Sequence, residues 1–255
     1  MSKLPKQYQF VDLSDYGRVV ARRIAGSLTN TSVTPIQVTY WFIFSGLLAI
    51  VCILYELNMA AAFFLILKSI LDAADGELSR LKNTPSYVGR YFDSIADIVL
   101  NFLFLLTFWY VTEISILFFL LAFTGVQLQG TLFNYYYVIL RNSVNGDTTS
   151  RVFEDKVPQA MKGEDQRTVN KYFKVFNLLY RPFDKIIYAI DKGAVNSKPF
   201  PKWFMTSVSS IGLGFQLLIM SLMLILNVQQ YIIPFFIFYS AQIVLLVGIR
   251  RFVLK

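Results

Sequence analysis

Four aspartates stand where two apolar stretches of the chain meet a short polar connection. Asp72 and Asp75 are three residues apart at the end of one stretch, and Asp93 and Asp97 are four residues apart at the start of the next. Both spacings place the two members of a pair on one face of a helix. Because the connection is short, we expect two antiparallel neighbouring helices whose four carboxylates lie close together at one depth.

Carboxylates gathered so closely repel one another and attract a cation. The sequence contains no histidine and a single cysteine, Cys52, which argues against a histidine base, a zinc site and an internal disulfide. Oxygen ligands suit hard divalent cations, so the pattern predicts a Mg²⁺ or Mn²⁺ site, with one ion or two. The alternative is a set of solvated acids at helix ends, each paired with a neighbouring base: Lys68, Arg80, Lys82 or Arg90.

The residues between the acids fit a phosphate group. Gly76 directly follows Asp75, and Gly89 lies four residues before Asp93. Glycines allow a backbone to approach a ligand closely, and the guanidinium of Arg80 can clamp phosphate oxygens. Taken singly, each glycine is better explained by ordinary loop or helix packing.

The elements that hold these residues are long and apolar. Hydrophobic residues make up 55% of the 255 residues and form runs long enough to cross a bilayer, which takes about 20 residues per helix. At that depth a charged side chain costs about 2.5–3.5 kcal/mol, which marks the four aspartates as functional. We expect an all-α integral membrane protein with one membrane domain, residues 35–255, which includes a long polar loop at 141–202. The six predicted transmembrane helices are 35–57, 58–81, 91–110, 114–140, 203–226 and 231–249.

Residues 1–34 are polar and basic, with no sign of a cleavable signal peptide. Apolar residues recur in them at helical spacing, which predicts an amphipathic helix on the membrane surface; the alternative is a short soluble helix. The aromatic stretch 172–190 predicts another surface helix. The apolar stripe of the first segment consists of Leu13, Tyr16, Val20, Ile24 and Leu28.

Charge orients the six predicted spans. The connections near 56–59, 111–114 and 226–231 contain Glu56 and Glu113 and no Lys or Arg, so the basic residues fall on the side of the termini. Since short cytoplasmic loops carry the excess of Lys and Arg, both termini and the acidic cluster are predicted to be cytosolic. The net charge of +8 is then explained by topology and lipid headgroups rather than by nucleic acid.

The whole acidic stretch resembles a family motif. It reads Asp72-x2-Asp75-Gly76-x2-Ser79-Arg80-x8-Gly89-x3-Asp93-x3-Asp97. This is similar to the motif D-x2-D-G-x2-A-R-x8-G-x3-D-x3-D of the CDP-alcohol phosphotransferase family, with Ser79 in place of the usual Ala. Residues 34–39, Thr-Pro-Ile-Gln-Val-Thr, look like the family's entry segment T-P-N-x-V-T, with Ile36 in place of Asn.

The resemblance implies a role for each matching residue. Asp72, Asp75 and Asp93 match acids that hold two divalent metals, and Asp97 matches an acid that contacts metal and acts as the general base. The resemblance also implies a CDP-alcohol donor, a lipid or small-alcohol acceptor, contact with membrane lipids and a homodimer. The matching nucleotide-pocket positions are Gly76, Arg80 and Gly89, together with Ser86, Pro35, Ile36, Gln37 and Val38.

The resemblance implies phospholipid synthesis with release of CMP, and leaves the substrates open. A phosphorylated acceptor would require several basic residues near the later spans, where Arg141, Arg250 and Arg251 are the main ones. This favours transfer from CDP-choline or CDP-ethanolamine to diacylglycerol over phosphatidyl transfer from CDP-diacylglycerol to glycerol phosphate, inositol phosphate or serine. More distant alternatives are a membrane prenyltransferase, which uses two separated Asp-rich motifs, and an ion transporter, which typically shows internal repeats.

Overall fold

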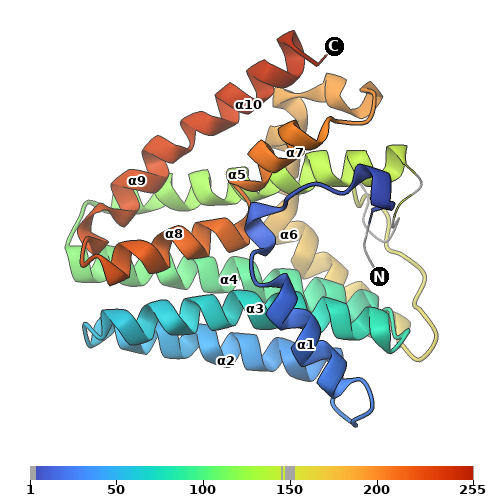
Figure 1. Ribbon diagram of the computed structural model, residues 1–255, viewed down its shortest axis with the longest axis horizontal. Coiled ribbons are helices and arrows are strands. Elements are labelled where there is room, and N and C mark those ends of the chain that lie inside the picture. Colours follow the sequence, from blue (N-terminus) through green and yellow to red (C-terminus); the bar gives the residue numbers. More distant parts are fainter. Residues whose placement is uncertain (1–3, 145, 147–152, 255) are drawn as a thin grey trace.

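The computed structural model describes residues 4–144, 146 and 153–254, and within these ranges the chain is helical and has no strand (Figure 1). Short 3-10 turns occur at Lys6–Tyr8, Leu13–Asp15, Lys192–Asn196 and Gln229–Tyr231. The α-helices are α1 Arg18–Leu28, α2 Pro35–Leu54, α3 Asn58–Leu81, α4 Tyr87–Thr112, α5 Ile116–Ser143, α6 Gln166–Ile190, α7 Lys202–Ser209, α8 Leu213–Ile225, α9 Ile232–Tyr239 and α10 Ala241–Phe252.

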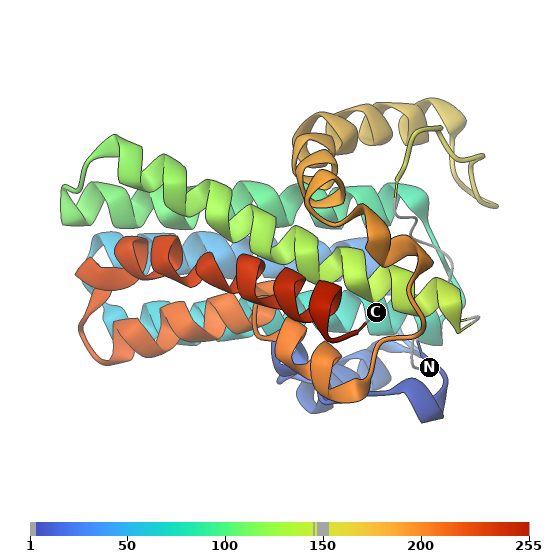
Figure 2. The same cartoon turned by 90° about the horizontal axis from the view of Figure 1, so that it is seen from above.

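The long helices α2, α3, α4 and α5 run alongside one another, with α8 and α9 completing the bundle (Figures 1 and 2). The connections α2–α3, α4–α5 and α8–α9 lie at one end of it, on the left of Figure 1. Asn58 Nδ2 donates to Asn227 Oδ1 at 2.9 Å and so joins the first of these connections to the third. The three connections that lack basic residues therefore share one end, and the α3–α4 connection lies at the other.

Local sequence fixes where the bundle helices begin. At α2, Thr34 and Gln37 form a reciprocal capping box, and Pro35 occupies the first turn, where its missing N–H is not needed. At α4, Ser86 Oγ accepts from the backbone N–H of Gly89 at 2.8 Å. These caps fix the ends of the two helices that border the acidic stretch.

Small residues let α2, α3 and α4 approach closely. Ala61, Ala62 and Ala74 on α3 are almost fully buried. A Cβ added to Gly46 of α2 would lie 2.9 Å from the methyl groups of Leu100 on α4, so any larger residue would require the Leu100 side chain to move. Helix α2 packs against both α3 and α4, so it holds the acids at the end of α3 opposite the start of α4.

Four helical segments are long and apolar enough to cross a membrane: Pro35–Leu54, Tyr87–Thr112, Ile116–Ser143 and Gln229–Phe252. The bent pair α7 and α8, which turns by 48°, makes five if it counts as one span. Helix α3 is long enough but carries Lys68, Asp72, Asp75 and Glu77, which lower its hydropathy. The chain is thus a membrane protein with several spans, and the predicted number of six is not confirmed.

The predicted fifth span, 203–226, is divided into α7 and α8 because the N-terminal segment packs into it. The N–H of Leu13 donates to Ser209 Oγ at 2.9 Å. A Cβ added to Gly214 would lie 1.8 Å from the carbonyl oxygen of Ser14, so the backbones of the two segments touch. The predicted sixth span is likewise divided at Ser240 into α9 and α10.

Two polar segments also contain helices. Helix α1 packs against α3 and buries Ala21 and Ala25, whereas Leu13 of the predicted apolar stripe lies in a separate 3-10 turn. The stretch 172–190 is helical, as predicted, within the longer helix α6. Whether either helix lies on a membrane surface stays a prediction.

Candidate active site

Helices α3 and α4 bring their acids together at one end of the bundle. Asp72, Asp75 and Asp93 each offer a carboxylate oxygen within 4.8 Å of the others, and this is the spacing of a group that could hold a metal ion. Asp75 is buried, and the other two are partly buried. Two helical pairs that are distant along the chain thus form one acidic cluster.

Asp97 joins this cluster through Lys68. The ammonium of Lys68 is fully buried, donates to Asp72 Oδ2 at 2.7 Å on its own helix, and makes a second ion pair with Asp97 on α4. It also lies 4.6 Å from the centre of the Phe42 ring. The sequence indicates the contact with Asp72, one turn away, but not the one with Asp97. Lys68 therefore ties the acids of α3 to those of α4.

The other neighbouring bases have partners outside the cluster. Arg80 binds Glu77 at 2.8 Å, and Arg90 binds Glu154 through two hydrogen bonds of 2.5 and 2.7 Å. The ammonium of Lys82 donates to two backbone carbonyls before α2. The alternative in which each acid pairs with its own base is therefore wrong for these three residues.

The cluster fits a hard cation. Asp93 Oδ1 is buried and has no hydrogen-bond partner among the described residues. Asp75 Oδ2 accepts from Thr39 Oγ1 at 2.7 Å, which orients that carboxylate. A buried acceptor without a donor is costly, and a cation bound by oxygen atoms would satisfy it. The donor set therefore suits Mg²⁺ or Mn²⁺.

Two cavities meet at the acidic cluster, and both are lined by Asp75, Gly76, Arg80, Arg90 and Asp93. The main cavity, of about 420 Å³, extends from Asp72 and Asp97 towards α5, α6 and α8. The side cavity, of about 430 Å³, extends towards the start of α2 and α4. The acids thus lie at the junction of two spaces that two reactants could fill.

Most of the predicted nucleotide positions line the side cavity. Pro35, Ile36, Ser86 and Gly89 lie there, with the shared Gly76 and Arg80. Two predicted positions are placed elsewhere. The side chain of Gln37 is used in the cap of α2, and Val38 is fully buried in the core. The structure therefore gives no support for nucleotide contacts from Gln37 or Val38.

Ser86 is also engaged by a segment that follows α5. Its hydroxyl donates to Glu164 Oε1 at 2.7 Å, and the N–H of Val88 donates to the same oxygen at 2.8 Å. Burial alone would raise the pKa of Glu164, but the hydrogen bonds from Val88 and Ser86 outweigh it and hold that pKa below its usual value. Glu164 thus fixes the segment beside the start of α4.

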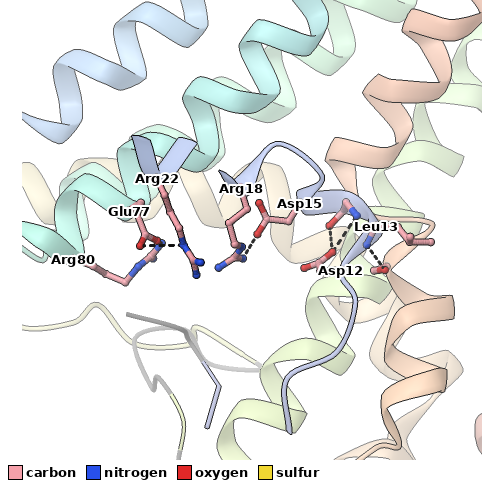
Figure 3. Close-up of polar contacts among 9 residues, drawn as sticks. Asp12, Leu13, Asp15, Arg18, Arg22, Glu77 and Arg80 are labelled. Atoms are coloured by element: carbon pink, nitrogen blue, oxygen red, sulfur yellow. Dashed lines mark hydrogen bonds and ion pairs between the residues drawn. The ribbon is translucent and has the colours of Figure 1, made fainter. Parts of the chain in front are cut away.

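The charges of the two cavities differ in sign. Basic side chains outnumber acids in the side cavity, where Arg80, Lys82, Arg90 and Arg141 face Asp75 and Asp93. The main cavity is lined by nine carboxylates and four guanidinium groups. Figure 3 shows two of these guanidinium groups, from Arg22 and Arg80, converging on Glu77, and Arg18 pointing to Asp15. The side cavity therefore suits anionic phosphate, whereas the main cavity does not.

Four residues near the cluster are absent from the sequence prediction as site residues: Thr39, Glu154, Tyr180 and Asp184. Thr39 belongs to the entry segment that the sequence singles out, so a signal was present. Glu154, Tyr180 and Asp184 come from the long loop after α5 and reach the cavity only because α6 folds back onto α4 and α5. The last two are four residues apart in an aromatic stretch, which is a weak signal of a shared helix face.

Comparison with known proteins agrees with this geometry. Residues 32–160 match the family described as CDP-alcohol phosphatidyltransferase. The matching segment includes α2, α3, α4 and α5, and with them all four aspartates. A search of curated proteins found no match. The family supports transfer of a phosphoalcohol group in phospholipid synthesis. Since the match extends over half of the chain and contains the whole acidic cluster, this protein belongs to the CDP-alcohol phosphatidyltransferase family.

Proposed function

We propose that this protein transfers a substituted phosphate group from a CDP-alcohol to the hydroxyl of an acceptor and releases CMP. The observation that carries the proposal is the group of three carboxylates within 4.8 Å, which lies where a basic cavity meets an acidic one. The transfer reaction needs a site for the pyrophosphate of the CDP-alcohol and a second space for the acceptor. The two cavities supply these two spaces, and both are lined by the acidic cluster.

The nucleotide occupies the side cavity in this proposal. Arg80 lies at the junction, where its guanidinium can donate to phosphate oxygens. Its ion pair with Glu77 is made through Nη2 alone and holds the side chain in place. Gly76 and Gly89 line the same space without side chains, so the nucleotide can approach both helices closely. Pro35, Ile36 and Ser86 form the rest of this wall.

Asp97 is the proposed general base, since it lines the main cavity, from which the acceptor would approach. The acceptor oxygen forms a bond to the phosphorus of the transferred group as the bond between that phosphorus and the CMP oxygen breaks. The acceptor proton passes to the Asp97 carboxylate. A positioned base of this kind typically contributes about 10²–10⁴-fold to a rate. Lys68 orients Asp97 by its ion pair.

Asp72, Asp75 and Asp93, with Asp97 beside them, are the proposed ligands of two Mg²⁺ or Mn²⁺ ions. When bound, such ions neutralise charge that develops on the pyrophosphate oxygens. Thr39 orients Asp75 and Lys68 orients Asp72, so the ligands are held by both α2 and α3.

Among the substrates that the family uses, the charge pattern favours CDP-choline or CDP-ethanolamine with diacylglycerol as acceptor. The alternative is phosphatidyl transfer from CDP-diacylglycerol to glycerol phosphate, inositol phosphate or serine. A phosphorylated acceptor would need basic groups in the main cavity beyond those proposed for the donor. Arg80 and Arg90 are shared with the side cavity, and the other two arginines, Arg18 and Arg22, contact carboxylates.

The proposed topology has six spans, in which α3 is the second, α7 with α8 the fifth and α9 with α10 the sixth. Helix α3 has 24 residues, long enough to cross the hydrocarbon core, and its charged residues begin at Lys68 and continue towards the end that carries the acidic cluster. Both termini and the active site are proposed to face the cytosol. Residues 1–34 form a cytosolic segment on the membrane surface ahead of the 35–255 membrane domain. The homodimer implied by the resemblance stays a prediction.

The test is CMP release by the purified protein with Mg²⁺ or Mn²⁺ across a panel of donors and acceptors. The donors are CDP-choline, CDP-ethanolamine and CDP-diacylglycerol. We expect metal-dependent CMP from one donor–acceptor pair and its loss in Asp97→Asn. A prenyltransferase or an ion transporter would release no CMP, and such a result for every pair, with no binding of CDP, would refute the proposal.

A further inference from the structure

Helix α6 forms one wall of the main cavity and begins beyond the segment that matches the family. Two neighbouring residues anchor it. The hydroxyl of Tyr180 donates to the carbonyl oxygen of Ser94 on α4 at 2.7 Å, in the turn between Asp93 and Asp97. The ring of Phe183 lies edge-on to the ring of Phe123 on α5, with centroids 6.4 Å apart. The helix is thus fixed against both α4 and α5.

Asp184 lies directly after these anchors and lines the main cavity, on the same helix face as Phe176 and Tyr180. It is partly buried, and its carboxylate makes no hydrogen bond or ion pair with the described residues. Two aromatic rings and an unpaired carboxylate therefore face the space that the acceptor side of the reaction would occupy.

The remaining charges of the main cavity are already engaged. Each of its four arginines contacts a carboxylate: Arg18 with Asp15, Arg22 and Arg80 with Glu77, and Arg90 with Glu154. Asp12 accepts from Ser14. The four aspartates of α3 and α4 are the proposed metal ligands. Among the carboxylates that line the main cavity, Asp184 is then the one that has no partner in the described part of the chain and is not a proposed metal ligand.

The surroundings of Asp184 favour a cationic partner. Burial, and then the charge of Glu154, raise the pKa of Asp184 to about 7. A positive ligand group beside it would offset both causes at once, whereas a phosphate group would add to the repulsion. Aromatic rings such as those of Phe176 and Tyr180 also attract ammonium groups.

We infer that Asp184 is a specificity-determining residue, which binds an ammonium group on the reactant that enters the main cavity against the α6 wall. This inference rests on the proposed function. The ammonium can belong to a CDP-linked amino alcohol whose headgroup passes the junction, or to a free amino alcohol that attacks CDP-diacylglycerol. In both cases the chemistry that Asp184 recognises is the same.

The test measures CMP release by the full-length protein and its variants in lipid nanodiscs with Mg²⁺. One arm compares CDP-ethanolamine with CDP-glycerol, each with diacylglycerol as acceptor. The other arm uses CDP-diacylglycerol and compares serine and ethanolamine with glycerol and glycerol phosphate. The variants are Asp184→Asn, the charge-preserving Asp184→Glu, and the control Asp155→Asn, which removes a carboxylate that is exposed and outside the cavity.

We expect the ammonium-bearing reactant to be preferred in one of the two arms. That arm shows whether the ammonium group belongs to the CDP-linked donor or to the acceptor. For that reactant, Asp184→Asn should raise KM about 10- to 100-fold and change kcat less than about twofold. The reason is that the lost charged hydrogen bond contributes to binding of the reactant and not to the chemical step. Asp184→Glu should retain most of the preference, and Asp155→Asn should behave as wild type.

Two outcomes would overturn the inference while leaving the proposed function intact. One is robust CMP release by the wild type with a neutral or phosphorylated reactant in preference to the ammonium-bearing one. The other is an equal effect of Asp184→Asn on ammonium-bearing and neutral reactants. Absence of CMP from every pair would instead refute the proposed function, and the inference with it.

Discussion

At the scale of single residues, Lys68 explains how four acids can share one end of a bundle. Its ammonium is fully buried between Asp72 on α3 and Asp97 on α4. It neutralises part of the acidic charge and fixes the distance between the two helices. The sequence predicts the clustering and one of the two ion pairs. It does not predict the second, because that contact depends on how α3 and α4 are rotated.

Replacement of Lys68 by Met should destabilise the protein, because removing one member of a buried ion pair costs about 3–5 kcal/mol. The loss should be largest without divalent cation and smaller in excess Mg²⁺, which can neutralise the same acids. CMP release should fall at least about tenfold, since Asp97 loses its orienting contact. Thermal unfolding with and without Mg²⁺, together with initial rates, measures both effects. Lys171→Met, on the exposed side of α6, is the control; equal behaviour of the two variants would refute this role of Lys68.

The pKa of Asp184 predicts a pH dependence. Since burial and Glu154 raise it to about 7, the carboxyl is largely neutral at pH 6 and largely ionised at pH 8. An ammonium binds the ionised form, so KM for the ammonium-bearing reactant should fall about five- to tenfold as the pH rises across this range. The KM of Asp184→Asn should lack this component. The same pH slope in wild type and variant would contradict the assignment.

At the scale of elements, the sequence predicts the helices that carry the motif better than those that complete the cavity. Hydropathy identifies α2, α4 and α5, and the helical spacing of the aspartates is reproduced in α3 and α4. The breaks between α7 and α8 and between α9 and α10 depend on tertiary contacts, such as that of Ser14 with Gly214. The helix within 172–190 is predicted, but its docking against the active site is not, because an aromatic face can pack on a membrane surface as well as on the helices α4 and α5.

Loss of the Tyr180 hydrogen bond should loosen α6. Tyr180→Phe removes the bond to Ser94, which is worth about 0.5–1.5 kcal/mol, and so should raise KM for the ammonium-bearing reactant a few-fold. Amide hydrogen exchange in α6 should increase in parallel. Tyr188→Phe is the matched control on the same helix, since its hydroxyl makes no hydrogen bond with the described residues. Unchanged exchange in Tyr180→Phe would show that this contact does not hold the helix.

At the scale of the whole molecule, the sequence predicts one end that carries Lys and Arg and one end that lacks them. The connections that lack Lys and Arg lie together at one end of the bundle (Figure 1), and the acidic cluster lies near the other. Hydropathy predicts the number of spans less well, because the charged residues of the proposed active site make α3 less apolar than the other bundle helices. The orientation stays a prediction of the charge pattern.

Labelling of single cysteines in intact cells tests that orientation. In a Cys52→Ser background, Glu113→Cys and Lys156→Cys place exposed thiols in a connection that lacks basic residues and in the long loop, respectively. A membrane-impermeant maleimide should label Glu113→Cys in intact cells and Lys156→Cys only after permeabilisation. The reverse pattern would invert the topology, and labelling of both in intact cells would require a different number of spans.

The central claim is that the acids of α3 and α4 hold a divalent cation at which a CDP-alcohol is cleaved to CMP. The most direct measurement is the rate of CMP release against Mg²⁺ concentration, with the reactive donor–acceptor pair, for wild type, Asp93→Asn and Asp155→Asn. We predict saturable dependence on Mg²⁺ for wild type and Asp155→Asn. For Asp93→Asn we predict a loss of at least about 10²-fold, because the buried carboxylate without a partner is removed from the site. CMP release that persists with a chelator, or in Asp93→Asn at the wild-type rate, would contradict the claim.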